Sequence, residues 1–219
     1  MSYELYYWPS IQGRGEFVRL ALEDAGADYR DIARGKDGVN VMLKAMKRHG
    51  VFAPPFLKDK ERVVSHTAAI LHYLGPRLGL APKAEAARLR LHQLQLTITD
   101  FLVEVHDTHH PIANSLYYEE QTAEALRRTK LFREARIPKF LGYFETQATL
   151  PFSYVSLSLF QVMEGLDYAF PDTMRKTNYK NLRKLQENVR KRLSAYLASE
   201  RRIPFNQSGL FRRYPELDG

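Results

Sequence analysis

The chain contains no cysteine among its 219 residues. It therefore has no disulfide framework, no thiolate metal ligand and no cysteine nucleophile, and any sulfur chemistry must arrive on a ligand. It also lacks an apolar run near the ~18 residues of a membrane span. The N-terminus has no basic segment followed by an apolar stretch, so we expect a cytoplasmic protein without membrane contact. The remaining composition, 44% hydrophobic and 26% charged, is ordinary for a globular protein of one or two domains.

The net charge of +8 raises the question of a polyanionic partner. Much of the excess lies between Arg175 and Arg192, where Leu182, Leu185 and Val189 recur at helical spacing. That pattern is typical of an amphipathic helix with a solvated basic face. Because no aromatic residues alternate with the basic ones on an exposed surface, we expect no nucleic-acid partner.

The first part of the chain, up to about Leu80, alternates short strand-like runs with helical ones. We predict strands at Glu4–Trp8, Asp28–Ile32, Phe56–Lys58 and Val63–Val64, and helices at Gly15–Ala25, Val39–Arg48 and Thr67–Leu74, the last ended by Gly75-Pro76. This βαβαββα order predicts one mixed α/β sheet covered by helices, the thioredoxin-like arrangement, over residues 1–80.

The second part shows helical periodicity only, after a linker at residues 81–84. We therefore predict an all-α domain over residues 85–219. Its expected helices are Glu85–His109, Glu119–Glu134, Ile137–Thr149, Ser153–Tyr168 and Thr177–Leu197. The aromatic, irregular tail from Pro204 is expected to pack back on the protein.

Two short segments of the first part carry the chemistry. In one, Tyr6-Tyr7-Trp8-Pro9 ends a strand and Gly13-Arg14-Gly15-Glu16 opens a helix. In the other, Ala53-Pro54-Pro55-Phe56 leads into a hairpin, and Ser65-His66-Thr67 opens the next helix. A phenol at a strand end and a hydroxyl at a helix N-terminus suit a small anionic peptide whose thiol is to be polarised.

These segments, the linker and the helical half together resemble the soluble glutathione transferases of the Tyr type (sigma, mu, pi and alpha). The resemblance implies the glutathione transferase fold, a homodimer and a detoxification reaction. Glutathione would be the cosubstrate, its thiolate adding to an apolar electrophilic small molecule, and no metal would be needed. Two alternatives stay open: a non-catalytic glutathione- or ligand-binding protein on the same fold, and a glutathione-dependent peroxidase or isomerase.

Tyr7 is the residue that the resemblance assigns to catalysis. A phenol that donates a hydrogen bond to sulfur favours the thiolate, and so lowers a thiol pKa whose free value is about 8.5. Adjacent strand residues face opposite sides, so Tyr6 and Tyr7 cannot both reach the sulfur. The interval between Tyr7 and Gly13 is one residue longer than is usual in the family, which leaves Tyr6 and Ser10 as rivals.

The resemblance also assigns a binding role to the second segment. Pro55 occupies the position of a cis-proline whose preceding residue pairs with the peptide ligand, although Pro54 has no N–H to donate. His66, in place of the family's glutamine or glutamate, and Thr67 would bind the γ-glutamyl carboxylate at a helix N-terminus. The alternatives are a trans turn at the prolines and plain N-capping by Ser65 or Thr67.

Other assignments rest on the resemblance alone. Trp8, with Lys44 or Lys47, would contact the glycyl carboxylate, and Asp100 would reach across the dimer to the γ-glutamyl amine. Side chains of these charged types are most often simply solvated on helix surfaces.

The histidine-rich stretch that contains His106 and His110 places two imidazoles four residues apart, as in some metal sites. The His-Glu-x-x-His pattern is absent and Pro111 follows at once, so we expect the rim of the acceptor pocket here rather than a metal. Candidate lining residues are Ile11, Val103, His106, His110 and Tyr117.

A capping-box position is occupied by Ser153 and Ser156, where the family has aspartate at the second site. We expect the shorter neutral partner to cap less well, by ~1 kcal/mol, with consequences for stability only.

Overall fold

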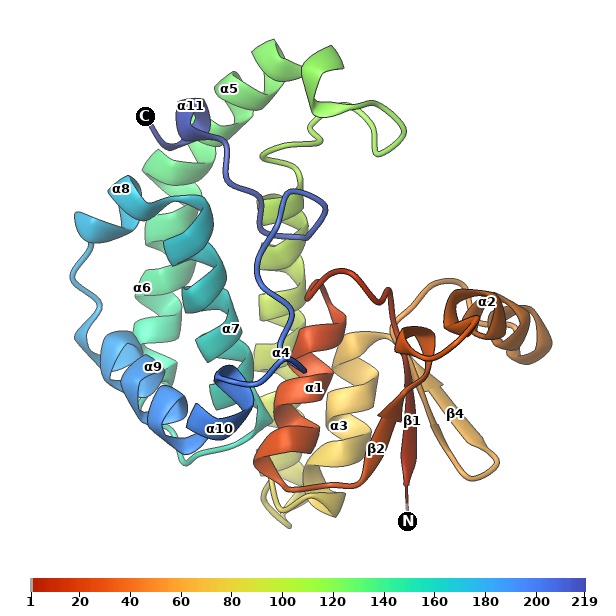
Figure 1. The fold of residues 1–219 in the computed structure, drawn as a ribbon. Helices are drawn as coiled ribbons and strands as arrows, with labels where there is room; N and C mark the ends of the chain where they lie inside the picture. Colours follow the sequence, from red (N-terminus) through yellow and green to blue (C-terminus); the bar gives the residue numbers. More distant parts are fainter. Residues whose placement is uncertain (1) are drawn as a thin grey trace.

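A computed structural model describes residues 2–219. Its single sheet is formed by β1 (Tyr3–Tyr6), β2 (Tyr29–Asp31), β3 (Phe56–Asp59) and β4 (Arg62–Ser65). The strand order is β2-β1-β3-β4, with β2 parallel to β1 and the β3–β4 hairpin antiparallel to it (Figure 1). The predicted mixed sheet is therefore confirmed.

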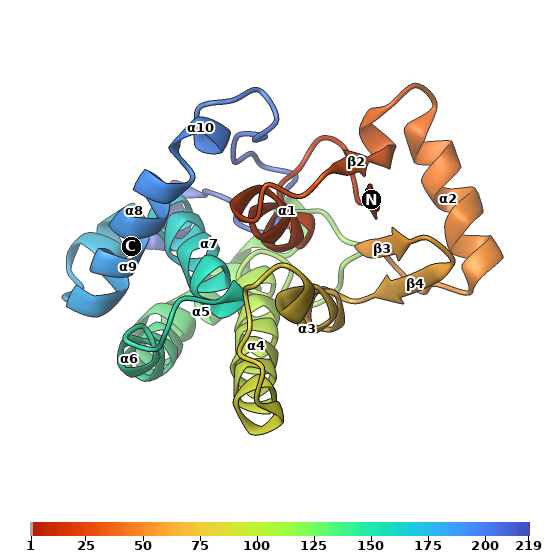
Figure 2. The ribbon, with the colours of Figure 1, turned by 90° about the horizontal axis from the view of Figure 1, so that it is seen from below.

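Three helices cover this sheet: α1 (Gly15–Asp24), α2 (Gly38–His49) and α3 (Thr67–Arg77), with a short 3₁₀ turn at Ile32–Arg34. The helices α1 and α3 lie between the sheet and the helical half, and α2 covers the opposite face (Figure 2). Alternation along β1 explains the division, because Leu5 packs with residues of α1 and α3 while Tyr6 packs with Met42 of α2.

The prediction that Gly75-Pro76 ends the third helix is wrong, since α3 continues to Arg77. A proline deprives a helix of one hydrogen bond, to the carbonyl four residues earlier. Here that carbonyl belongs to His72, an exposed residue, and Pro76 is exposed as well. The loss falls on the solvent side of the last turn, so the helix tolerates it.

The second half is entirely helical. Its elements are α4 (Glu85–His106), a 3₁₀ turn (Tyr118–Glu120), α5 (Thr122–Leu131), a π-helical turn (Phe132–Arg136), α6 (Ile137–Gln147), α7 (Tyr154–Ala169), α8 (Pro171–Arg175), α9 (Lys180–Arg192), α10 (Ser194–Leu197) and α11 (Pro215–Asp218). The predicted arrangement, a thioredoxin-like half followed by an all-helical half, is confirmed.

Several helix ends differ from the prediction. The fourth helix ends at His106 rather than His109, and the fifth begins at Thr122 rather than Glu119. The basic run breaks at Leu193, whose backbone leaves helical angles (φ −102°, ψ 16°). The break lets the chain turn so that Tyr196 is buried. Tertiary contacts, which no local pattern records, decide these ends.

The helix α7 is the centre of the second half, contacting α1, α4, α8 and α9. The tail packs back as predicted, with Leu210, Phe211 and Leu217 buried, and it runs beside α4 and the loop after β1 (Figure 1). No helix within residues 2–219 is long and apolar enough to cross a membrane.

Candidate functional site

Tyr7 lies immediately beyond β1 and is almost fully buried, at 5% exposure. Its hydroxyl oxygen accepts a hydrogen bond from the backbone N–H of Arg14 at 2.8 Å. Burial raises the pKa of the phenol, against the lowering effects of that N–H and of the Arg14 and Arg19 charges. The phenol is therefore protonated at neutral pH, and its own hydrogen has no acceptor among the described residues.

The loop that supplies this N–H closes tightly around the tyrosine. A Cβ added at Gly13, where φ is +44°, would lie 2.1 Å from the Tyr7 hydroxyl oxygen, and one at Gly15 would lie 2.5 Å from its ring. Only glycine permits both the backbone angle and this approach. The two glycines of the Gly13-Arg14-Gly15 sequence therefore allow the loop to pack closely against the buried Tyr7.

The two rivals of Tyr7 lie elsewhere. The Tyr6 ring stacks on Phe56 at 4.3 Å on the α2 side of the sheet, and its hydroxyl donates to Glu4 Oε2 at 2.9 Å. Burial, followed by that carboxylate, raises the pKa of Tyr6 to about 12. Ser10 is exposed in the turn after β1, and its carbonyl accepts from Asn206 of the tail at 2.9 Å.

Thr67 and Tyr7 both form hydrogen bonds with the backbone of Arg14. The Thr67 Oγ1 donates to the carbonyl of Arg14 at 3.3 Å, while the N–H of the same residue donates to Tyr7. The N-termini of α1 and α3 are thereby joined beside the Tyr7 hydroxyl. The sequence predicts no role for Arg14 itself, although it lies within the Gly13-Arg14-Gly15-Glu16 motif.

The two prolines and His66 form the neighbouring part of the same group. The Pro54–Pro55 peptide bond is cis, as predicted, which removes the alternative of a trans turn. The Pro55 carbonyl accepts from the His66 N–H at 3.2 Å. His66 has φ +74°, a conformation that residues other than glycine rarely adopt and that is frequent at binding sites.

The N-terminus of α3 lacks a side-chain cap. His66 is the N-cap residue and makes no capping hydrogen bond, and Thr67 is the first helical residue. The alternative of plain capping by Ser65 or Thr67 is therefore wrong. The first N–H groups of α3 keep the partial positive charge that attracts a carboxylate.

The remaining predicted contacts are not drawn into this group. Trp8 is 39% exposed next to Tyr7. Lys44 and Lys47 are exposed on α2, and Asp100 is exposed on α4. Within residues 2–219 these three charged side chains make no hydrogen bond or ion pair.

The histidine-rich stretch forms an imidazole cluster at the end of α4. Ring centroids of His106, His109 and His110 lie 4.8–5.2 Å apart. Burial lowers the pKa of all three, so they are mainly neutral at pH 7. Within residues 2–219 no group of three or more His, Asp or Glu side chains is arranged to hold a metal ion.

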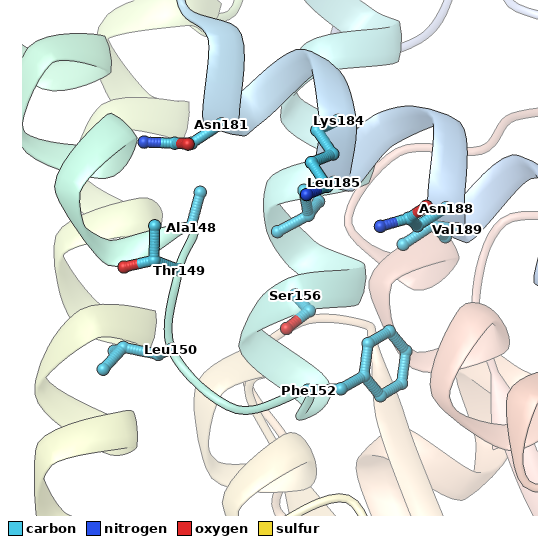
Figure 3. Close-up of a pocket in the computed structure, with 10 residues that line it drawn as sticks. All are labelled: Ala148, Thr149, Leu150, Phe152, Ser156, Asn181, Lys184, Leu185, Asn188 and Val189. Carbon is cyan, nitrogen blue, oxygen red and sulfur yellow. The ribbon is translucent and has the colours of Figure 1, made fainter.

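A separate cavity of about 350 Å³ lies in the helical half, between residues 148–152 and α9. Asn181, Lys184 and Asn188 line it from the α9 side, and Ser156 and Phe152 from the other (Figure 3). None of the predicted site residues lines this cavity. The group around Tyr7 therefore remains the candidate site.

A protein-family model matches part of the second half of the chain. Residues 106–200 match the family described as "Glutathione S-transferase, C-terminal domain". Among curated proteins, "Glutathione S-transferase 1" of Ascaris suum is 28% identical over 138 residues, which are 63% of this chain and 61% of the relative. "Glutathione S-transferase P 10" of Caenorhabditis elegans is 30% identical over 122 residues, 55% of this chain and 53% of the relative. Each alignment thus spans less than two thirds of the relative's length.

Solved structures agree with the observed fold over nearly the whole chain. The prostaglandin synthase D of Nilaparvata lugens has a TM-score of 0.73 and 18% identity, covering 94% of this chain and 100% of that one. A pi-class glutathione S-transferase of Onchocerca volvulus has a TM-score of 0.70 and 22% identity, covering 90% and 92%. At these identities the likeness concerns the fold.

Proposed function

We propose that this chain, a member of the glutathione transferase family, binds glutathione beside Tyr7 and activates its thiol for attack on an electrophilic small molecule. The observation that carries the proposal is the meeting of Tyr7 and Thr67 at Arg14. The Arg14 carbonyl accepts a hydrogen bond from Thr67 of α3, the helix that would hold the ligand carboxylate. The Arg14 N–H donates to the hydroxyl of Tyr7, which would face the sulfur.

The Tyr7 hydroxyl is suited to stabilising a thiolate. It accepts the Arg14 N–H and stays protonated, so its hydrogen is available to donate to sulfur. Donation to the charged form of the thiol lowers the thiol pKa, each unit being about 1.4 kcal/mol of preferential stabilisation. The thiol proton passes to solvent and the thiolate forms a C–S bond with the acceptor, which expels its leaving group or takes up the electron pair.

The tripeptide would be held by the residues around Tyr7. The uncapped N-terminus of α3, with Thr67 and His66, would take the γ-glutamyl carboxylate. The Pro54 carbonyl would accept from the ligand backbone, since Pro54 has no N–H to offer. Trp8, Lys44 and Lys47 would serve the glycyl end. We further predict that residues 81–84 link the half that binds glutathione to the half that binds the acceptor. We also predict a cytoplasmic location.

We propose further that the protein works as a homodimer. Leu89, Leu96 and Val103 are 56%, 42% and 47% exposed at even intervals on α4, and Phe52 before β3 is 99% exposed. Asp100 lies on the same face of α4, one turn from Leu96. A second copy that covers this apolar face would let Asp100 reach the γ-glutamyl amine of its partner's ligand.

The decisive experiment is a titration of bound glutathione, following thiolate absorbance against pH in wild type, Tyr7→Phe and Tyr6→Phe. We expect the bound thiol pKa to lie well below about 8.5 in wild type and to rise by ~1–2 units in Tyr7→Phe. Tyr6→Phe, which loses a hydroxyl on the other face of the sheet, should behave as wild type. Equal depression in wild type and Tyr7→Phe would assign the donor to another group, and no depression in wild type would favour the non-catalytic binding protein.

A further inference from the structure

A buried charged cluster lies directly beneath the loop that contacts Tyr7. We define the inner cluster as Glu16, Arg19, Asp31, Tyr196 and Arg202. Glu16 and Arg19 are both 0% exposed. Burying such groups is costly unless they are paired and hydrogen-bonded. Arg19 is paired through Nε, 2.7 Å from Asp31 Oδ2, and through Nη1, 3.3 Å from Glu16 Oε2, while its buried Nη2 has no partner among the described residues.

Arg19 links the inner cluster to the loop and to Tyr7. Its Nη1 lies 3.4 Å and 3.5 Å from the carbonyl oxygens of Gln12 and Ile11. Its guanidinium carbon is 5.7 Å from the centre of the Tyr7 ring. Two residues beyond Gln12, the Arg14 N–H reaches the Tyr7 hydroxyl. A displacement of Arg19 would therefore move both the ring and the N–H that polarises it.

The segment from α10 to Arg202, which precedes the tail, holds the other side of the same cluster. Glu16 Oε1 accepts from the Tyr196 hydroxyl and from Arg202 Nη1, both at 2.8 Å. Arg202 Nη2 donates to Gln161 Oε1 at 3.2 Å, and Gln161 Nε2 donates to Gln12 Oε1 at 2.7 Å. Arg202 thus reaches the loop by two routes, through Glu16 and through Gln161.

The charges of the cluster also favour an anion nearby. The cations paired with its two carboxylates are Arg19 and Arg202 of the inner cluster and, outside it, Arg34, whose Nε is 3.0 Å from Asp31 Oδ2. The carboxylates are Glu16 and Asp31. Loss of Arg202 would change this balance from one net positive charge to none, and would leave Glu16 with one cation fewer.

We propose that Arg202 and Tyr196 are positioning residues for thiol activation, holding Glu16 and Arg19, and through them the loop that sets the Tyr7 hydroxyl. The proposal rests on the proposed function, because it concerns the acidity of the same bound thiol. It makes thiol activation depend on the segment from α10 to Arg202, which contributes no side chain to the group around Tyr7.

The test compares Arg202→Met, Arg202→Lys and Tyr196→Phe with Arg201→Met. Arg201 is a matched control, an adjacent arginine that is exposed and pairs with Glu23 at 2.8 Å. The readouts are the pKa of bound glutathione, its Kd and the thermal midpoint. In Arg202→Met the fraction of bound thiol ionised at pH 7 should fall by ~3- to 10-fold, from weaker positioning and the lost charge. Arg202→Lys should restore part of the ionised fraction that Arg202→Met loses. Arg201→Met should keep the wild-type fraction.

Several outcomes separate this proposal from the proposed function. A depressed thiol pKa in wild type that is unchanged in both folded Arg202→Met and folded Tyr196→Phe would overturn the positioning role alone. A wild-type thiol pKa at the free value would overturn the proposed function and the positioning role with it. Should Arg202→Met fail to fold, Tyr196→Phe decides, since it removes one hydroxyl and keeps every charge.

Discussion

At the residue scale, the two neighbours of the buried His109 ring determine which of its nitrogens carries the hydrogen. Its Nε2 lies 3.0 Å from the Leu210 carbonyl, which can only accept, so Nε2 carries a hydrogen. Burial lowers the pKa of His109 to about 3, so the ring is neutral and Nδ1 is an acceptor. His110 Nδ1, at 2.6 Å, must then be the donor. The pair ties the end of α4 to the tail.

This neutral histidine predicts a pH dependence of stability. With an unfolded pKa near 6.5 and a folded value of about 3, the unfolded chain binds a proton that the folded one does not. Its contribution is fully present above pH 6.5 and is lost as pH falls towards 3, by up to about 1.4 kcal/mol per pH unit. Urea denaturation at pH 7.5, 6.5 and 5.5 should show a steeper loss in wild type than in His109→Gln.

The exposed His49→Gln is the control for this measurement and should keep the wild-type slope. Equal slopes in wild type and His109→Gln would show that His109 is not the group responsible.

At the scale of elements, α7 is a buried helix whose packing limits side-chain size. Nearly all of its residues are buried, and Ser153 donates its N–H to Ser156 Oγ at 3.1 Å at the start. This bond from the N-cap backbone to the side chain three residues later is one of the two bonds of a capping box. Ser156 therefore accepts the bond that aspartate accepts at this position in the family. In the middle of α7, Gly165 allows the ring of Phe211 to approach the backbone.

Two helix-interior glycines therefore predict opposite effects of the same substitution. A Cβ at Gly165 would lie 2.4 Å from the Phe211 ring, while one at Gly142 of α6 would meet nothing within 4 Å. Gly165→Ala should destabilise the protein by ~1–3 kcal/mol through overpacking. Gly142→Ala should stabilise it by ~0.5–1 kcal/mol through helix propensity. Chemical denaturation measures both, and a stable Gly165→Ala would contradict the packing.

At the scale of the whole molecule, the exposed face of α4 predicts self-association. Sedimentation equilibrium should give about twice the 25.4 kDa of one chain. Leu96→Glu, which places a charge in the centre of the proposed interface, should shift the protein to monomer. Leu131→Glu, on the comparably exposed Leu131 of α5, should leave the dimer intact. A monomeric wild type would remove both the interface and the role proposed for Asp100.

The sequence alone determined the strands and the longer helices and their order, because hydrophobic periodicity and turn residues are local signals. The short helices α8 and α11 were not predicted. The strand–helix alternation of the first half and the helical second half follow from such signals, whereas the cis bond at Pro55 was predicted from the family resemblance. Strand alternation predicted that Tyr6 and Tyr7 face opposite sides without choosing between them, and the structure places Tyr6 against Phe56. What local signals cannot record is which distant residues meet.

The tertiary structure decided those meetings. Glu16 and Arg202 are separated by 186 positions and still share a buried hydrogen bond, for which no periodicity exists. The continuation of α3 past Pro76 and the break of the basic helix at Leu193 were also decided by burial and exposure rather than by local sequence. The reason is physical: a buried charge is tolerated only where its partners have been assembled, and that assembly exists only in the folded chain.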